Sequence, residues 1–370
     1  MKYSYWELKE WFTNIDFTIV GSGIVGLNCA LYLKKRYPKA TVLILEKGML
    51  PQGASTKNAG FACFGSLSEL IDDLKTHTPE EVYDLVDKRW NGLRLLRENL
   101  GDKKIDFQQH KGFELFDAKE VFEECMSEKE SLNKLLKPMF KEDVFSVTEN
   151  LFNFQNSYKK YISNKFEGQI DTGKMALELL YKVQKLGVKI LNNISVERFA
   201  ESGNRVTIET NKITFKTNKL WIAINGFSNQ LLEEKVEPAR AQVLITKPIK
   251  NLHIRGTFHL DKGYYYFRNI HDRILIGGGR NIDFEVENTT TFGCTKRIQN
   301  KLEQILKEIV LHNLPFEIEH RWSGIMGVGQ QKKAIVKQVS NNVFCGVRLG
   351  GMGVAIGSLV GKELAELVDS

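Results

Sequence analysis

The hexapeptide Gly21-Ser22-Gly23-Ile24-Val25-Gly26 carries the strongest structural signal in this 370-residue chain. It follows an apolar run, residues 17–20, that predicts a buried strand, and it opens a segment, residues 23–37, that predicts a helix. At this spacing the first glycine permits a tight turn, the second lets a pyrophosphate approach the helix N-terminus, and the third lets the helix pack closely on the strand. Glu46 ends the next predicted strand, residues 41–45, where a carboxylate can accept hydrogen bonds from ribose hydroxyls. These features predict a nucleotide-binding unit on a parallel sheet.

The composition argues against several other classes of protein. Lys and Arg total 52 against 45 Asp and Glu, but the excess is spread along the chain, so we expect no nucleic-acid partner. The five cysteines are odd in number and form no CxxC pair, which argues against a disulfide framework and a metal site. The apolar stretch 15–33 is interrupted by three glycines, so it predicts neither a transmembrane helix nor a signal peptide. The expected location is the cytoplasm.

Periodicity along the rest of the chain predicts alternating helices and strands without internal repeats or a linker. The length fits about two domains, and without a linker these must be interleaved. The main predicted helices cover residues 175–186, 295–312 and 356–368, and the main predicted strands cover residues 188–191, 205–210, 213–215, 219–224, 241–246, 263–268, 273–277 and 343–347.

The segment after Glu46 separates two kinds of nucleotide-binding protein. A simple dehydrogenase would enter a helix and a third strand, but this chain runs through Gly53-Ala54-Ser55-Thr56-Lys57-Asn58-Ala59-Gly60-Phe61. This loop resembles the GAS-x-(R/K)-N-x-G-F loop of the D-amino-acid oxidase and glycine oxidase superfamily of FAD-dependent oxidoreductases. In that family the loop runs along the pyrophosphate and reaches the flavin ring, which implies such roles for Ser55, Lys57, Asn58 and Gly60.

Three further segments continue the resemblance to the C-terminus. Trp221-Ile222-Ala223-Ile224-Asn225-Gly226-Phe227-Ser228 is similar to the family's second nucleotide-binding turn. Arg321-Trp322-Ser323-Gly324-Ile325-Met326-Gly327 resembles the W-x-G-I-M-G stretch of the amine-oxidising branch. Residues 346–354 resemble the closing glycine-rich loop, whose amides and following helix face the flavin N1 and C2 carbonyl and would stabilise negative charge on a reduced flavin.

The fingerprint and the resemblance together imply FAD as the cofactor and a set of contact residues spread along the chain. The predicted cofactor-binding residues are Gly21, Ser22, Gly23, Ile24, Val25, Gly26, Glu46, Lys47, Ser55, Thr56, Lys57, Asn58, Ala59, Gly60, Phe61, Val196, Ala223, Asn225, Gly226, Gly324, Gly350, Gly351, Met352, Gly353 and Val354.

The predicted strand 263–268 supplies the substrate side of the site. Alternation puts Tyr264, Tyr266 and Arg268 on one face and Tyr265 and Phe267 on the other. Alignment with glycine oxidases places Tyr265 nearest their substrate-contacting tyrosine. The predicted catalytic residues are Tyr265, Arg268, Met326 and Arg348.

Two departures from the family leave the substrate and the electron acceptor open. Met326 stands where glycine oxidases carry the arginine that binds the substrate carboxylate, so Arg268, Arg348 or Arg280 replaces it, or the substrate has no carboxylate. Leu275 stands near the position of the lysine that promotes reaction with oxygen in sarcosine oxidases. The acceptor is therefore oxygen, a quinone or another oxidant.

Two residue types near these motifs carry no predicted chemistry. Cys63 follows the flavin loop by three residues but matches no motif for covalent flavin attachment, and it is expected to be a buried thiol. The histidines, His259 among them, show no ligand spacing and are expected at surface or core positions.

The predicted fold is α/β. It combines a Rossmann-type, glutathione-reductase-like FAD domain with a parallel sheet (1–80, 160–235 and 325–370) and an interleaved α+β substrate domain with an antiparallel sheet (81–159 and 236–324). The predicted activity transfers a hydride from the C–N bond of a small amine or amino acid to flavin N5, giving an imine that water hydrolyses. Two alternatives remain: an FAD-dependent dehydrogenase of 2-hydroxy acids such as L-2-hydroxyglutarate, and an RNA-modifying or accessory flavoprotein.

Overall fold

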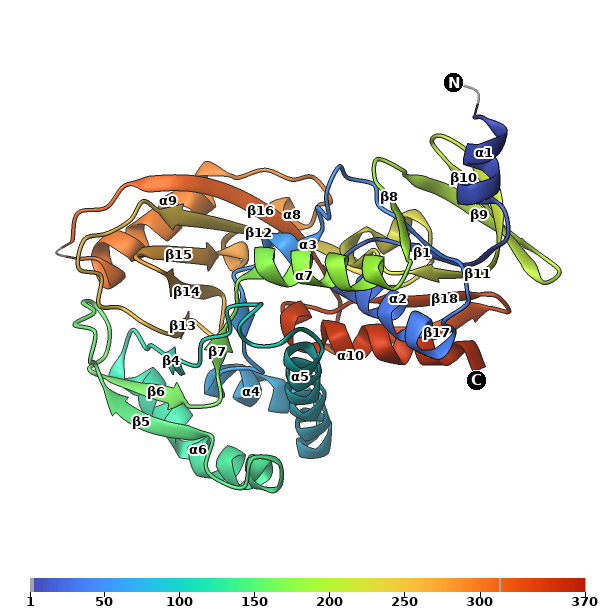
Figure 1. Cartoon of the computed structure of the whole chain (residues 1–370). Coiled ribbons are helices and arrows are strands. Elements are labelled where there is room, and N and C mark those ends of the chain that lie inside the picture. The colour runs from blue at the N-terminus through green and yellow to red at the C-terminus, as the bar shows by residue number, and fades with distance from the viewer. Residues whose placement is uncertain (1–2, 313, 370) are drawn as a thin grey trace.

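The computed structural model describes residues 3–312 and 314–369, which form two large sheets joined by crossing helices (Figure 1). The first sheet has the order β17-β18-β11-β1-β2-β8, with the hairpin strands β9 and β10 attached to β11. Its strands are β1 Ile15–Val20, β2 Val42–Leu45, β8 Lys189–Leu191, β9 Val196–Ser202, β10 Arg205–Thr210, β11 Thr214–Ile222, β17 Ile335–Ser340 and β18 Val343–Val347. The pairs β1–β2, β1–β11, β2–β8 and β11–β18 are parallel, which confirms the predicted sheet type.

The second sheet has the order β16-β12-β15-β14-β13-β4-β6-β5 and is antiparallel except between β13 and β4. Its strands are β4 Gly112–Glu114, β5 Phe145–Glu149, β6 Lys160–Asn164, β12 Glu237–Thr246, β13 Thr257–Leu260, β14 Tyr265–Ile270, β15 Arg273–Gly278 and β16 Ile318–Val328. A short antiparallel pair, β3 Phe61–Ala62 and β7 Gly168–Gln169, lies apart from both sheets in the pairing scheme. The predicted α/β class is therefore confirmed. The first sheet combines the parallel pairs with three antiparallel pairs, β9–β10, β10–β11 and β17–β18, and the second sheet is almost wholly antiparallel.

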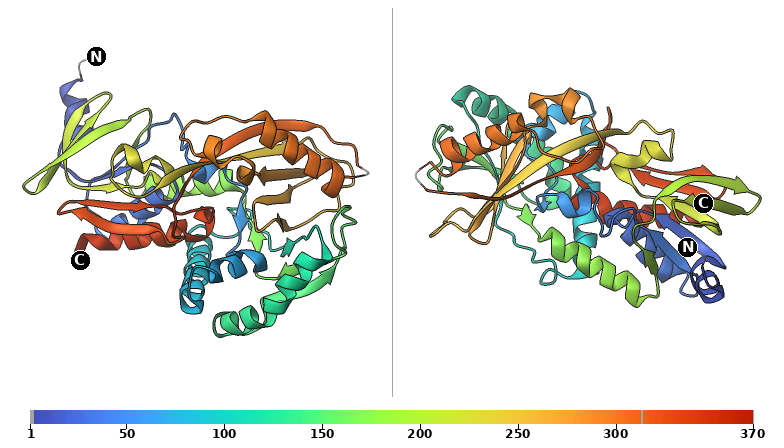
Figure 2. Two further views of the ribbon diagram at one scale, coloured as in Figure 1. Left: turned by 180° about the vertical axis from the view of Figure 1, so that it is seen from behind. Right: turned by 90° about the horizontal axis from the view of Figure 1, so that it is seen from above.

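The helices cover the sheets and connect them. They are α1 Tyr5–Glu7, α2 Ile24–Arg36, α3 Ala54–Lys57, α4 Leu67–Leu74, α5 Pro79–Leu100, α6 Lys119–Phe140, α7 Thr172–Lys185, α8 Phe284–Glu287, α9 Lys296–Ile305 and α10 Gly353–Glu366. Figure 2 shows from two further directions that α1 and the end of α10 both lie on the half that contains the parallel sheet. Among the described residues, no helix is both long enough and apolar enough to cross a membrane.

Sequence periodicity located the main elements but divided one of them. The predicted strands 213–215 and 219–224 are one strand, β11, because the chain stays extended where it pairs with both β10 and β1. The predicted helix 295–312 is α9 followed by a π-helical segment, Leu306–Val310. The short strands β4 and β6 carried no clear periodic signal.

Two elements next to the predicted domain boundaries pack with the part of the chain on the other side of the boundary. Helix α5 contributes Leu93, Leu96 and Leu100 to the same apolar cluster as α2 and α10, although the predicted boundary at residue 80 assigns it to the substrate domain. Strand β6 lies in the antiparallel sheet, although the boundary at residue 160 assigns it to the FAD domain. A helix or strand of this length carries no local signal for which sheet it joins.

Gly92 lets α5 cross closely over α10. A Cβ atom at this position would lie 2.1 Å from the carbonyl oxygen of Ala355, a backbone atom that cannot move aside alone. We therefore expect Gly92→Ala to lower the free energy of unfolding by about 1–3 kcal/mol through overpacking. Arg94→Ala, at an exposed position on the same helix, should change it by less than about 0.5 kcal/mol. Chemical denaturation of both variants tests this, and equal stability would contradict the close crossing.

Candidate functional site

A cavity of about 940 Å³ lies where the carboxyl ends of the parallel strands meet the antiparallel sheet. Residues at or just after the ends of β1, β2, β11 and β18 line one part of it, and side chains of β12, β13 and β14 line another. The carboxyl edge of a parallel sheet is the usual place for a nucleotide in such folds. The volume of the cavity is at the upper end of the range of about 300–1,000 Å³ for ligand pockets.

The glycine hexapeptide forms the turn that its sequence predicts. Gly21 has a φ of +102°, and a Cβ there would lie 2.7 Å from the carbonyl oxygen of Ala223. A Cβ at Gly26 would lie 2.0 Å from the carbonyl oxygen of Gly21, so α2 packs directly on the turn. Both positions therefore require glycine, and the start of α2 faces the cavity.

Glu46 is buried beside this turn and lines the cavity. Its carboxylate accepts hydrogen bonds from the Ser22 backbone N–H at 3.1 Å, the Ser22 hydroxyl at 2.6 Å and the Gly48 N–H at 2.9 Å. The Ile24 N–H, in the first turn of α2, donates to Ser55 Oγ at 2.9 Å. These bonds connect α2, β2 and the loop of residues 53–61, called the flavin-type loop below, into one edge of the cavity.

The glycines around the cavity test whether FAD fits. Built Cβ atoms at Gly53, Gly350 and Gly351 would meet no atom within 4 Å, so their backbones border open space. All three line the cavity, and α10 begins at Gly353, two residues after Gly351. Bare backbone beside the N-termini of α2 and α10 suits a pyrophosphate and a flavin that gains negative charge. The residues present therefore fit FAD.

Most predicted cofactor-binding residues line this cavity, and four do not. Ser22 holds Glu46, and Gly26 packs on Gly21. The Thr56 hydroxyl donates to the Pro51 carbonyl at 2.6 Å. Gly226 packs against the backbone of Met326, where a Cβ would lie 2.4 Å from the carbonyl oxygen. These four residues stand behind the cavity wall and shape it.

An aromatic wall from β3, β13 and β14 lines the cavity beside the flavin-type loop. The Phe61 ring meets the His259 ring edge-to-face with centroids 5.3 Å apart, and the Tyr266 ring at 5.5 Å. Tyr264 also lines the cavity. The prediction for Tyr265 needs correction: it turns to the opposite face of β14 and packs with Phe258 and Phe267 in the core under α9. Alternation separated the two faces correctly, but the alignment selected the face that α9 covers.

The three arginines considered as carboxylate partners lie in different places. Arg280 lines the cavity, and its guanidinium lies 4.8 Å from the centre of the Phe284 ring. Arg268 is buried behind Gly60, and Arg348 donates from Nε to the Lys333 carbonyl at 3.1 Å, so neither lines the cavity. Met326, in the position of the family arginine, does line it. Burial lowers the pKa of Arg280, which stays a cation at neutral pH.

His259 belongs to a buried charged group that the sequence did not reveal. Its Nε2 lies 2.5 Å from Glu167 Oε1, and its Nδ1 lies 3.9 Å from Glu69 Oε2. Thr257 donates to the same Glu167 oxygen at 3.0 Å. Burial alone lowers the pKa of His259, but the neighbouring carboxylates, Glu167 foremost, outweigh burial and raise the pKa to about 9. Glu167 is 92 residues away along the chain, so no local pattern indicates the pair.

Cys63 also lines the cavity, next to the charged group. The Cys63 Sγ lies 3.8 Å from Met352 Sδ. It also lies within 4.8 Å of a carboxylate oxygen of Glu167 and of a ring nitrogen of His259. Burial raises the pKa of Cys63 well above its usual value, so the thiol is neutral at physiological pH. This buried thiol is the environment that the sequence predicts.

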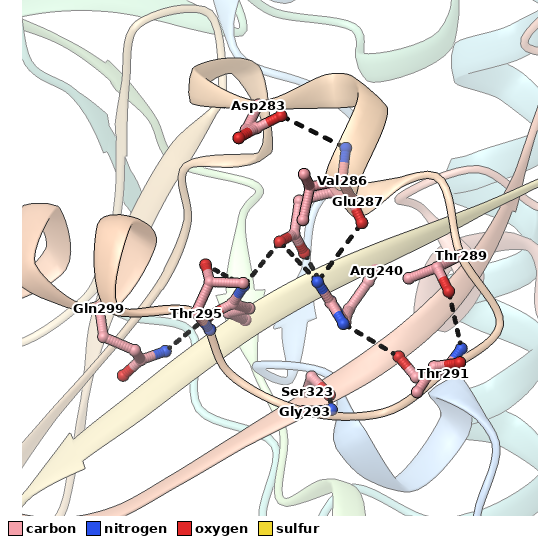
Figure 3. A network of polar contacts seen from close by, with 11 residues as sticks. Arg240, Asp283, Val286, Glu287, Thr289, Thr291, Gly293, Thr295, Gln299 and Ser323 are labelled. Atoms are coloured by element: carbon pink, nitrogen blue, oxygen red, sulfur yellow. Dashed lines mark hydrogen bonds and ion pairs between the residues drawn. The ribbon is translucent and has the colours of Figure 1, made fainter.

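A second buried ion pair holds the loop that carries Arg280 (Figure 3). Arg240 on β12 donates from Nε and Nη2 to the two carboxylate oxygens of Glu287, at 2.8 and 2.9 Å, and from Nη1 to the Thr291 carbonyl at 3.3 Å. Gln242 donates to Glu287 Oε1 at 2.9 Å. Thr291 and its neighbours line the cavity, so this network fixes one side of the cavity.

Comparison with known proteins gives a family and a fold. The family model described as FAD dependent oxidoreductase (DAO) matches residues 16–367. No curated protein matches the sequence significantly. L-proline dehydrogenase from P. horikoshii is 19% identical with a TM-score of 0.76, over 96% of this chain and 93% of that one. Glycine oxidase from Bacillus cereus is 14% identical with a TM-score of 0.77, over 96% and 97%. Iminodiacetate oxidase from Chelativorans sp. is 16% identical with a TM-score of 0.75, over 95% of each chain. At these identities the likeness concerns the fold.

The Arg240–Glu287 pair generates a prediction about stability. The Glu287 side chain is 0% exposed, so Arg240→Ala leaves an uncompensated buried carboxylate. We expect a loss of about 3–5 kcal/mol in the free energy of unfolding. The matched control is Arg297→Ala, which removes an exposed ion pair with Asp283 and should cost less than about 1 kcal/mol. Denaturation curves that coincide for the two variants would refute the structural role of the buried pair.

The raised pKa of His259 generates a prediction about pH. The folded state binds the proton more tightly than the unfolded state, whose histidine has its ordinary pKa of 6.5. The resulting stabilisation, about 3 kcal/mol, is fully present below pH 6.5 and is lost as pH rises through about 9. Glu167→Gln should flatten this part of the stability profile. Urea denaturation across this pH range checks it, and equal slopes for both proteins would contradict the assignment.

Proposed function

The chain belongs to the FAD-dependent oxidoreductase family, and we propose that it oxidises the C–N bond of a small amino acid or related amine. The observation that carries this substrate class is Arg280 on the wall of the same cavity that the bare backbone of Gly53, Gly350 and Gly351 borders. Among the described residues, no carboxylate forms a hydrogen bond or ion pair with the Arg280 guanidinium. It is therefore available for the carboxylate of a substrate, in place of the family arginine that Met326 replaces. Three proteins of similar structure, L-proline dehydrogenase, glycine oxidase and iminodiacetate oxidase, support the same chemical class.

Each part of the cavity has a separate task in this proposal. Bound FAD supplies the hydride acceptor, so the protein needs only to bind, orient and enclose the substrate. Phe61, Tyr266 and His259 form a wall that excludes water from the reacting carbon. Glu69 lines the same region, where its carboxylate can accept a hydrogen bond from the substrate ammonium. Arg280 then fixes the orientation from the other end.

The direct test is anaerobic reduction of the purified holoprotein by a panel of L- and D-amino acids, amines without a carboxylate, and 2-hydroxy acids. Loss of the long-wavelength flavin absorption band identifies the substrate class. Reduction by amino acids supports the proposal, whereas reduction by 2-hydroxy acids alone replaces it with a hydroxy-acid dehydrogenase. Admitting air afterwards distinguishes an oxidase, whose colour returns quickly, from a dehydrogenase that uses another acceptor.

Arg280→Met tests the carboxylate partner. A hydrogen bond between charged groups contributes about 1.5–3 kcal/mol, so we expect KM for an amino acid to rise about 10- to 100-fold. KM for an amine without a carboxylate should stay the same. Arg297→Met, which removes an exposed arginine from α9, is the control. An unchanged KM for the amino acid in Arg280→Met would exclude Arg280 as the anchor.

A further inference from the structure

Arg268 lies directly behind the flavin-type loop. Its side chain projects from β14 and the residue is 5% exposed. A Cβ atom built on Gly60 would lie 3.0 Å from Arg268 Nη2 and 3.2 Å from its Cζ. Gly60 lines the cavity, so a single backbone segment separates the guanidinium from the cavity. Glycine at this position, with a φ of +74°, permits that close approach.

The charge of Arg268 lacks a direct partner in the described part of the chain. Its Nε makes no hydrogen bond, and no carboxylate pairs with the guanidinium there. Burial lowers its pKa to about 10, while Asp171 and Asp106 raise it from a distance. The group is therefore a cation at neutral pH. A buried, unpaired cation is unfavourable, which indicates that its compensating negative charge arrives from outside the protein chain.

The sheet holds Arg268 firmly in this position. In the β14–β15 register Arg268 pairs with Leu275, and the two side chains share one face of the sheet. Leu275 packs against Ala59, the neighbour of Gly60 on the same loop. On the other side Arg268 pairs with Thr257 of β13. Strands β14 and β15 therefore both support the flavin-type loop. Strand β15 contributes the apolar contact of Leu275, and β14 contributes the positive charge of Arg268.

We propose that Arg268 stabilises the negative charge that the flavin gains on reduction, acting across Gly60 from the protein side of the loop. In the interior the attraction between such charges is weakly screened. The residue does not line the cavity, and its effect is a higher flavin reduction potential. The inference rests on FAD binding and is independent of the amino-acid substrate proposed above.

The experiment uses purified holoproteins and no substrate. Arg268→Met replaces the charged side chain with an unbranched apolar one, and Arg268→Gln replaces it with an uncharged polar one. Arg268→Lys keeps the positive charge. Arg273→Met is the matched control, because Arg273 lies on the same hairpin but pairs with Glu319 at the surface. The probe is sulfite, whose sulfur lone pair forms a bond to N5 of the oxidised flavin and leaves the negative charge on the ring. Dye-coupled reduction gives the midpoint potential of each protein.

We expect Arg268→Met and Arg268→Gln to weaken sulfite binding at least tenfold and to lower the two-electron midpoint potential, by about 30 mV for each tenfold change in the equilibrium constant. Arg268→Lys should retain most of both properties, and Arg273→Met should match the parent protein. Loss of FAD from the uncharged variants with retention in Arg268→Lys also supports the proposal. Wild-type potential and sulfite affinity in an uncharged variant that holds FAD would overturn it, as would failure of Arg268→Lys to fold.

Discussion

The contact between Gly26 and the carbonyl of Gly21 is the constraint on which the rest of the site depends. Because no side chain separates α2 from the turn after β1, the helix starts at the edge of the parallel sheet. That position brings the Ile24 amide to Ser55 and places Ser22 against Glu46. These hydrogen bonds attach the flavin-type loop to the nucleotide-binding turn, and none of them involves a residue of the second sheet. The antiparallel sheet only has to meet this edge for the cavity to close.

The boundary between the two sheets contains buried charges at several points. Arg240–Glu287 holds the loop beside Arg280, His259–Glu167 pairs a histidine of the aromatic wall with a buried carboxylate, and Arg268 lies behind the flavin-type loop. The first two are pairs with short, well-formed contacts, whereas the third has no such partner among the described residues. A buried pair fixes geometry, and a buried single charge acts on whatever the cavity holds. Structural rigidity and electrostatic influence therefore come from different residues along the same boundary.

The parts of this structure that the sequence predicts are those set by local backbone requirements. Gly21 and Gly26 predict a turn and a close helix contact because only glycine fits at these positions. Glu46 follows Gly26 at the spacing that is typical of a nucleotide-binding unit. The sequence places Tyr265 on the wrong side of the sheet because period-2 alternation separates the two faces of β14 but does not indicate which face α9 covers. His259 and Glu167 belong to strands and loops far apart in sequence. The choice among Arg268, Arg280 and Arg348 depends on the path of the loops after β15 and β18, which no short pattern encodes.

The Arg240–Glu287 network has a consequence for how this enzyme can change. It anchors the loop after β15 through β12 and Gln242, and none of its bonds involves the residues that line the nucleotide end. Substitutions at loop positions that the network does not use, such as Arg280 and Phe284, can therefore alter the shape and charge of this side of the cavity while the Arg240–Glu287 anchor stays in place. The chain separates the region where new selectivity can evolve from the region that keeps it a flavoprotein. A laboratory selection confined to that loop would begin from a scaffold already suited to diversification.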